Sequence, residues 1–378
     1  MQTNRFETFM DAVFAIIITV LALKLNQPMD VTWNAVWDLN IYYLNYFICF
    51  FIIFNTWYED HILFQIVDEI DNRIVFVYGL MIFAISVLPY FATWVALNPY
   101  SVPAHSMFGL LFVLINVCYT VSKYLIIKAN PYNSELKKIN LKDFKRYVPL
   151  LMILIGFLLT YTVYVQGIYI SCLLATVYWF VMSISDKDEI TDTDRFEALF
   201  DAVVAIVLTI VVLEITMANG GSWQALFDLK LEFVAYAISF IVCFNYWNYN
   251  NNLFHLVNKI DYRVIWLIGI SMFLLSAIPY LSVFVAENFY SFVPQACYGI
   301  DFVLIVFLSI IITNVLKDVD KANVALQLAL RNNYHLILTV IVVGVGLVIG
   351  YFLYPPAVII SCLVSILLIW LIPHVHKF

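Results

Sequence analysis

Residues 5–25 read RFETFMDAVFAIIITVLALKL, and residues 195–215 read RFEALFDAVVAIVLTIVVLEI. Each stretch opens with Arg-Phe-Glu, carries an aspartate six residues after the arginine, and continues as an apolar run that holds one threonine. The offset of 190 residues continues along the chain in the pairs Trp33/Trp223, Asp71/Asp261, Pro89/Pro279 and Ser171/Ser361. A constant offset without a gap indicates tandem duplication of one folding unit.

The composition of the chain favours a lipid environment. Of its 378 residues, 64% are hydrophobic and only 12% are charged, and its mean hydropathy is +0.92. A soluble globule cannot bury that much apolar surface. The net charge of -7 argues against a nucleic-acid partner. The six cysteines lie singly in apolar runs, without metal-ligand spacing, and no nucleophile elbow or phosphate loop occurs, so we expect no metal, no cofactor and no enzyme.

The apolar runs predict membrane-spanning helices, because about 20 residues suffice to cross the hydrocarbon layer as a helix. Each copy holds six such runs. They lie at 6–25, 41–58, 74–97, 104–127, 148–165 and 168–185, and at 196–215, 231–248, 264–286, 296–316, 335–353 and 356–373. The predicted fold is an all-α polytopic membrane protein, with 12 transmembrane helices arranged as two parallel six-helix repeats. The domains are 1–185, a cytoplasmic acidic linker at 186–194, and 195–378.

Lysine and arginine predict the orientation, since cytoplasmic loops carry an excess of both. With the N-terminus in the cytoplasm, all 19 of these residues fall on the inner side except Lys24 and Lys230. Those two lie close to helix ends, where a long side chain reaches the interface. Both termini are therefore expected in the cytoplasm.

The opening helix of each copy divides its functional side chains between two faces. Ile16, Thr19 and Leu23 are spaced to share one face, while Asp11 lies about 140° around the axis from Ile16. An intramembrane carboxylate is a candidate functional group, but for Asp11 we favour a structural tie to Arg5 or to a backbone donor over direct ion binding. The second copy repeats the division with Ile206, Thr209, Leu213 and Asp201.

An R-x-x-x-F-S-D motif that opens an apolar, alanine-rich helix is typical of the transmembrane protein 175 family of potassium channels, and this chain resembles a two-repeat member. The tripeptide reads Phe9-Met10-Asp11 in the first copy and Leu199-Phe200-Asp201 in the second, so the motif serine is missing from both. The resemblance implies six spans per repeat, with the first and seventh helices lining the pore.

The resemblance also implies roles for individual residues. Ile16 and Ile206 would form the pore constriction. The residues that would line the pore and set its selectivity are Thr19, Leu23, Thr209 and Leu213. The permeant ion would be K⁺. A network of motif residues would hold the helices together, and its expected members are Arg5, Asp11, Asn55, Trp57, Arg195, Asp201, Asn245 and Trp247. Since two helices cannot enclose a pore, we expect a homodimer in the lipid bilayer that supplies four.

Two other functions remain open from the sequence. Parallel six-span repeats also describe secondary transporters, although the span centres here are almost free of charge. A proton-conducting channel is the other alternative, because the motif is altered. The loops fit a prokaryotic plasma membrane, which we favour over an endosome or lysosome.

Overall fold

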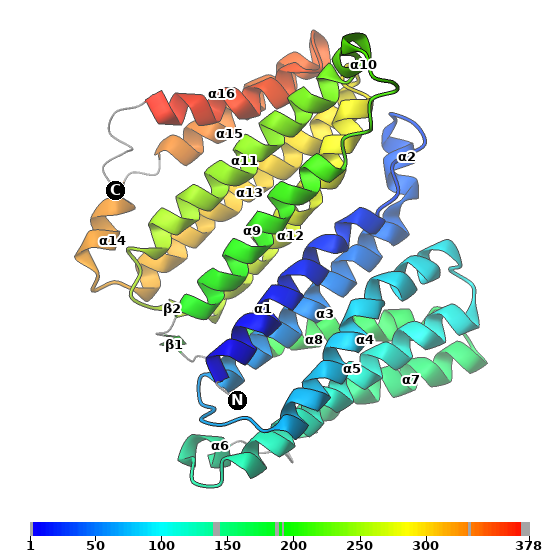
Figure 1. The fold of residues 1–378 in the computed structure, drawn as a ribbon, viewed down its shortest axis with the longest axis vertical. Helices are drawn as coiled ribbons and strands as arrows, with labels where there is room; N and C mark the ends of the chain where they lie inside the picture. The colour runs from blue at the N-terminus through cyan, green and yellow to red at the C-terminus, as the bar shows by residue number, and fades with distance from the viewer. Residues whose placement is uncertain (1–2, 139–143, 186–188, 191–192, 332–333, 372–378) are drawn as a thin grey trace. The chain divides into compact units, whose positions relative to one another are not determined.

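The computed structural model describes residues 3–138, 144–185, 189–190, 193–331 and 334–371, and almost all of them are helical (Figure 1). The helices form two compact units. Unit 1 contains Met1–Lys24 and Ile41–Asp186, and unit 2 contains Leu25–Asn40 and Lys187–Phe378. The segment Leu25–Asn40 thus follows the first helix in sequence but packs within unit 2.

Unit 1 has long helices at each of the six places that the first copy predicts. They are α1 (Thr3–Val20), α3 (Asn40–Phe64), α4 (Asn72–Leu97), α5 (Val102–Ala129), α7 (Val148–Thr162) and α8 (Gly167–Ser185). Short helical segments connect them: η1 (Ala22–Lys24), α6 (Ser134–Lys138) and η2 (Phe144–Tyr147).

Unit 2 repeats this order. Its long helices are α9 (Asp194–Leu213), α11 (Lys230–Phe254), α12 (Tyr262–Glu287), α13 (Phe292–Val319), α15 (Tyr334–Phe352) and α16 (Ala357–Leu371). Its short elements are α2 (Trp33–Asp38), β1 (Glu189–Ile190), α10 (Trp223–Asp228), β2 (Ile260–Asp261) and α14 (Val324–Ala329). Within this unit α9, α11 and α12 contact one another and run side by side in Figure 1.

The long helices confirm the all-α polytopic membrane fold. Among the described residues, eight helices are long and apolar enough to cross a membrane. α7, α8 and α16 are also apolar, but their apolar helical stretches are shorter than those of the eight. α11 contains a run of asparagines near its C-terminal end, and these polar residues make α11 less apolar than the other long helices.

The helix ends differ from the predicted spans where polar residues occur. The run 6–25 predicts one helix, but α1 ends at Val20 and a 3₁₀ turn follows, so Leu23 lies on that turn. The predicted ends at 58 and 248 are too early, because α3 and α11 continue to Phe64 and Phe254. Apolarity marks the part of a helix that lies in lipid, whereas a helix continues wherever its polar side chains are satisfied. On α3 the Asp60 carboxylate accepts a hydrogen bond from the Tyr78 hydroxyl at 2.9 Å.

Equivalent caps begin the equivalent helices of the two repeats. The Asp71 carboxylate accepts from the backbone N–H of Ile74 at the start of α4, and Asp261 does the same for Val264 at the start of α12. Such a side chain satisfies a donor that the first turn leaves unpaired. Duplicated capping residues therefore fix duplicated helix starts.

The predicted linker at 186–194 contains one element that the sequence does not signal. Glu189 pairs with Asp261 and Ile190 pairs with Ile260, so β1 and β2 form a short antiparallel ladder within unit 2. The acidic composition predicts a solvated connection, but backbone pairing needs only two extended residues next to a free edge.

Candidate functional site

The opening helix of unit 1 exposes an apolar stripe. Phe9, Ile16 and Leu23 are exposed, with 49% of Ile16 accessible, although its neighbours Ala15 and Ile17 are buried. The spacing of seven residues places Phe9 and Ile16 on one face of α1, and Leu23 follows on the 3₁₀ turn beyond the helix. This stripe contains the predicted constriction residue of the first copy.

The two predicted threonines occupy different environments. Thr19 is 1% exposed, and its hydroxyl donates to the carbonyl oxygens of Ala15 and Ile16, at 2.9 Å each. Thr209 is exposed on α9, where its hydroxyl donates to the Ile206 carbonyl at 2.8 Å. Both hydroxyl protons are thus held by the helix backbone, and of the two residues only Thr209 is exposed.

The second opening helix presents its predicted residues less uniformly. Ile206 is half-buried, whereas Leu213, at the last position of α9, is exposed. Ala205 and Thr209 are exposed, although the equivalent Ala15 and Thr19 are buried. α9 therefore exposes a face that is rotated from the one on α1.

An aspartate–tryptophan hydrogen bond ties each opening helix to the second long helix of its repeat. The Trp57 indole Nε1 donates to Asp11 Oδ1 at 2.8 Å, which joins α3 to α1. The Trp247 Nε1 donates to Asp201 Oδ1 at 2.7 Å, which joins α11 to α9. Asp11 is 3% exposed, whereas Asp201 is exposed. A hydrogen bond to a carboxylate is stronger than one between neutral groups, so each bond fixes the rotation of its helix.

The other predicted network residues lie in different places. Asn55 and Asn245 line cavities inside their respective units. Asn245 Oδ1 accepts from the Trp370 indole at 3.0 Å, which joins α11 to α16 and not to α9. Arg5 is exposed and Arg195 is half-buried.

A charged cluster inside unit 1 is absent from the predicted site residues. Glu59 Oε2 accepts from Lys123 Nζ at 3.2 Å and from the Tyr119 hydroxyl at 2.9 Å. Lys123 is 8% exposed and lies within the predicted span 104–127. An ionisable residue inside a span is itself a signal of a buried partner, and that signal was available in the sequence.

The charges that follow the two opening helices are opposite. Lys24 ends the turn after α1, and Glu214 occupies the equivalent position after α9; both are exposed. Although Glu214 as a residue is exposed, its carboxyl is partly desolvated by neighbouring groups, and this raises the pKa of the carboxyl. Among the described residues, no group of three or more His, Cys, Asp or Glu is placed to hold a metal ion.

Comparison with known proteins relates both repeats to one family. The model of the family described as endosomal/lysosomal potassium channel TMEM175 matches residues 5–89 and again residues 195–279. These ranges contain the opening helices and the tryptophans that bond to their aspartates.

Three bacterial proteins are similar to parts of the chain. Potassium channel HX13_20290 of Chryseobacterium sp. (strain P1-3) is 31% identical over 179 residues, which cover 47% of this chain and 92% of that protein. Potassium channel B446_29190 of Streptomyces collinus is 29% identical over 100 residues, which are 25% of this chain and 48% of that protein. Potassium channel Cha6605_3372 of Chamaesiphon minutus is 29% identical over 117 residues, which are 29% of this chain and 57% of that protein. With nearly all of the first relative covered and the family model matched in both repeats, this chain belongs to the TMEM175 family.

Proposed function

We propose that the protein is a potassium-permeable ion channel whose pore is lined by α1 and α9. The observation that carries the proposal is the exposed apolar stripe on α1, on a helix that the Asp11–Trp57 bond holds in a fixed rotation. The three bacterial relatives are each named a potassium channel, and this supports K⁺ as the permeant ion.

In this proposal Ile16 and Ile206 form the constriction. A ring of isoleucines offers no oxygen ligands, so an ion that enters it loses hydration without replacement, and the ring gates by expelling water. No T-V-G-Y-G stretch occurs in the chain, which distinguishes this pore from a carbonyl-lined filter. Selectivity then depends on ring width and on hydroxyls such as that of the exposed Thr209.

The pore requires four opening helices, so the proposed assembly is a homodimer in the lipid bilayer. A contact that the chain makes at one of two equivalent surfaces supports it. In unit 2 the Tyr280 hydroxyl donates to the Asn26 carbonyl at 3.2 Å, and the Gln27 amide donates to the Tyr280 carbonyl at 3.0 Å. Tyr280 is consequently 7% exposed, whereas its equivalent Tyr90 is 67% exposed.

The surface around Tyr90 is free to accept the equivalent segment from a second copy. That segment is Thr216-Met217, which corresponds to Asn26-Gln27. Met217 is 92% exposed. The Thr216 backbone carbonyl supplies the acceptor that a Tyr90 hydroxyl requires, while Met217 replaces the amide donor with an apolar contact. Two such contacts close a ring of two chains.

The proposed location is a prokaryotic plasma membrane, with both termini in the cytoplasm. The positive-inside distribution of lysine and arginine supports the orientation. The bacterial sources of the three relatives support the membrane.

A proton-conducting channel is the second candidate, because buried Asp11 is an ionisable group on the proposed pore helix. Purified protein in liposomes loaded with K⁺ tests the first candidate directly. We expect K⁺ efflux that rises in proportion to the gradient and needs no second solute. Efflux that saturates and depends on a co-solute would support a carrier, and no K⁺ efflux alongside proton flux would support the second candidate.

A further inference from the structure

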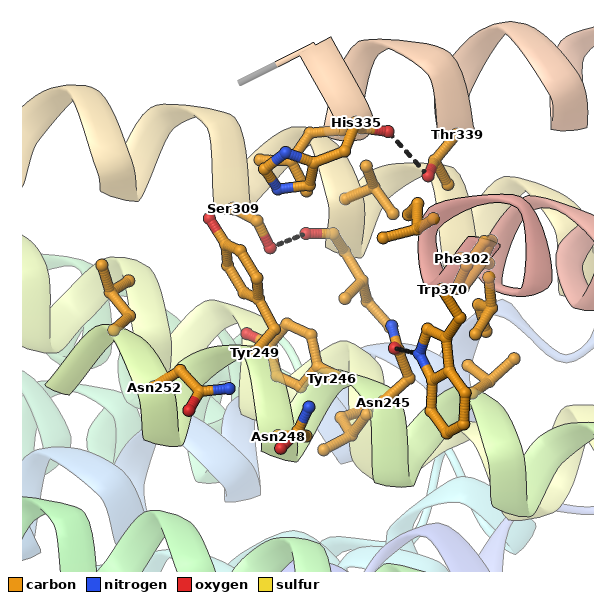
Figure 2. A pocket seen from close by; sticks show the side chains of 18 of the residues that line it. Asn245, Tyr246, Asn248, Tyr249, Asn252, Phe302, Ser309, His335, Thr339 and Trp370 are labelled. Atoms are coloured by element: carbon orange, nitrogen blue, oxygen red, sulfur yellow. Dashed lines mark hydrogen bonds between the residues drawn. The ribbon is translucent and has the colours of Figure 1, made fainter. Parts of the chain in front are cut away.

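Unit 2 contains a cavity of about 370 Å³ between α11, α13, α15 and α16 (Figure 2). It lies where α11 ends and α15 begins, and Leu330, just after α14, forms part of its wall. Sites for small molecules in proteins are typically about 300–1,000 Å³. The cavity is therefore large enough for a small organic molecule.

The wall combines an aliphatic lining with uncharged polar groups. Asn245, Asn248 and Asn252 of α11 face the cavity beside Tyr249 and His335, and no Asp, Glu, Lys or Arg is among the described residues that line it. Burying a charged ligand group without a countercharge is costly. The wall thus favours a molecule that is uncharged and partly apolar.

Three buried polar atoms of the wall residues have no hydrogen-bond partner among the described residues: the hydroxyls of Tyr246 and Tyr249, and Nε2 of His335. Tyr249 and His335 are adjacent in the wall, with ring centroids 5.8 Å apart. Buried polar atoms without a partner are rare in folded proteins, and each one calls for an explanation. A hydroxyl group both donates and accepts, so it suits a phenol and an imidazole nitrogen together.

The equivalent cavity of unit 1 is smaller and has a charged lining. It measures about 250 Å³, and Glu59 and Lys145 occupy the positions of Tyr249 and His335. There Glu59 is bonded to Lys123 and Tyr119, so the carboxylate is satisfied from within the unit. The two equivalent cavities thus differ: that of unit 1 contains an internal ion pair, and that of unit 2 is larger and contains neutral groups without a partner among the described residues.

We propose that the cavity of unit 2 binds one uncharged, hydroxyl-bearing amphiphile, of which a short-chain monoacylglycerol is the representative. Its hydroxyls bond to Tyr249 and His335, and its acyl chain lies along the aliphatic wall that includes Ile305. The glycerol ester is uncharged, which suits a wall whose described residues carry no countercharge.

Occupancy also bears on the opening helix, and this part rests on the proposed function. α11 faces the cavity with Asn245 and Tyr249, and its Trp247 holds Asp201 of α9. A bound molecule braces α11 on the side away from α9. The expected consequence is a change in K⁺ flux when the cavity is filled.

The test uses full-length protein, freed of lipid in detergent, with mono-octanoylglycerol and octanoate as probes and native mass spectrometry as the readout. We expect one mono-octanoylglycerol per chain and at least tenfold weaker binding of octanoate. Tyr249→Phe keeps the ring and removes the hydroxyl, which lowers affinity about five- to tenfold for a lost hydrogen bond. Ile305→Trp fills the cavity and abolishes binding.

The matched control is Ile115→Trp, which fills the cavity of unit 1 at the equivalent position and leaves binding intact. Equal binding to the Ile305→Trp and Ile115→Trp proteins would overturn the proposal, as would octanoate binding as tightly as its ester. If Ile305→Trp does not fold, an undiminished affinity of Tyr249→Phe overturns the proposal instead. Binding without any change in K⁺ flux contradicts the link to α9 alone, whereas a wild-type protein without flux contradicts the channel and leaves the binding result standing.

Discussion

Asp11 and Asp201 occupy equivalent positions in the two repeats but differ in environment. Each accepts a hydrogen bond from the tryptophan 46 residues later, yet Asp11 is buried and Asp201 is exposed. A buried acceptor that loses a partner costs more free energy than an exposed one, which water satisfies. The same substitution in the two repeats should therefore have unequal effects.

Trp57→Phe removes the indole donor and keeps an aromatic ring in its place. We expect it to lower the free energy of unfolding by about 1–3 kcal/mol, the cost of weakening a buried hydrogen bond to a charged group. Trp247→Phe should cost clearly less, because Asp201 is exposed. Thermal unfolding of the two purified variants in the same detergent makes the comparison, and equal losses would contradict the assigned environments.

The opposite charges after the opening helices lead to a second prediction. Lys24→Glu should raise K⁺ conductance at low salt, because a carboxylate near the pore mouth concentrates cations. Glu214→Lys should lower it. The pKa of Glu214 is raised by burial, so wild-type conductance should fall as the pH drops through a range above that of an ordinary glutamate, where this carboxyl gains its proton. Single-channel recording in low salt across a pH series measures both effects, and a Glu214→Gln protein with an unchanged pH profile would refute the assignment.

Close helix contacts of the fifth and sixth long helices depend on one glycine–serine pair in each repeat. A Cβ added to Gly156 of α7 would lie 2.5 Å from Ser171 Oγ of α8. The equivalent Gly346 of α15 faces Ser361 of α16 in the same way. Small residues let membrane helices approach closely, and this packing is what joins them in lipid.

Gly346→Ala forces these two helices apart. We expect it to lower the free energy of unfolding by about 1–3 kcal/mol, the usual cost of overpacking. Gly344→Ala is the matched control on the same helix, since nothing lies within 4 Å of a Cβ there. It should be neutral or stabilising by up to about 1 kcal/mol, because alanine favours the helix. Chemical unfolding of both variants decides, and equal stabilities would refute the close contact.

The sequence predicted the helices well because apolar runs and capping residues act locally. The places of α4 and α12 followed from the apolar runs 74–97 and 264–286, and the caps Asp71 and Asp261 now account for their starts. Burial depends on packing between distant segments, so it was not available from the sequence. Nothing in the duplicated pattern distinguishes buried Thr19 from exposed Thr209. Nor does the pattern predict the hydrogen bond that Trp370 donates to Asn245.

The duplicated surfaces are the basis of the proposed homodimer. The contact of Tyr280 with Asn26-Gln27 uses a surface that exists a second time around Tyr90, where it is open. A contact of this kind closes when each of two chains provides one segment and one surface. Such a dimer would also bring together the four opening helices, α1 and α9 of each chain, that the proposed pore requires.

A thiol-reactive bismaleimide tests the proposed homodimer. Tyr90→Cys combined with Met217→Cys should cross-link two chains and give a dimer on denaturing gels. The proposed contact places Tyr90 of one chain beside Met217 of the other, and both side chains are exposed in the single chain. Gln27→Cys combined with Tyr280→Cys should cross-link within one chain and stay monomeric. A monomeric product from the first pair, with efficient reaction of the second, would contradict the proposed dimer.

A potassium pore lined by α1 and α9 is tested most directly by the reversal potential of reconstituted protein under separate K⁺ and proton gradients. We expect a wild-type reversal potential that follows the K⁺ gradient. In a protein with Ile16→Asn and Ile206→Asn, we expect the conductance to rise and the K⁺ preference to fall, because amides wet the constriction. A reversal potential that follows protons, or one that is the same with and without the two substitutions, would contradict a potassium pore lined by α1 and α9.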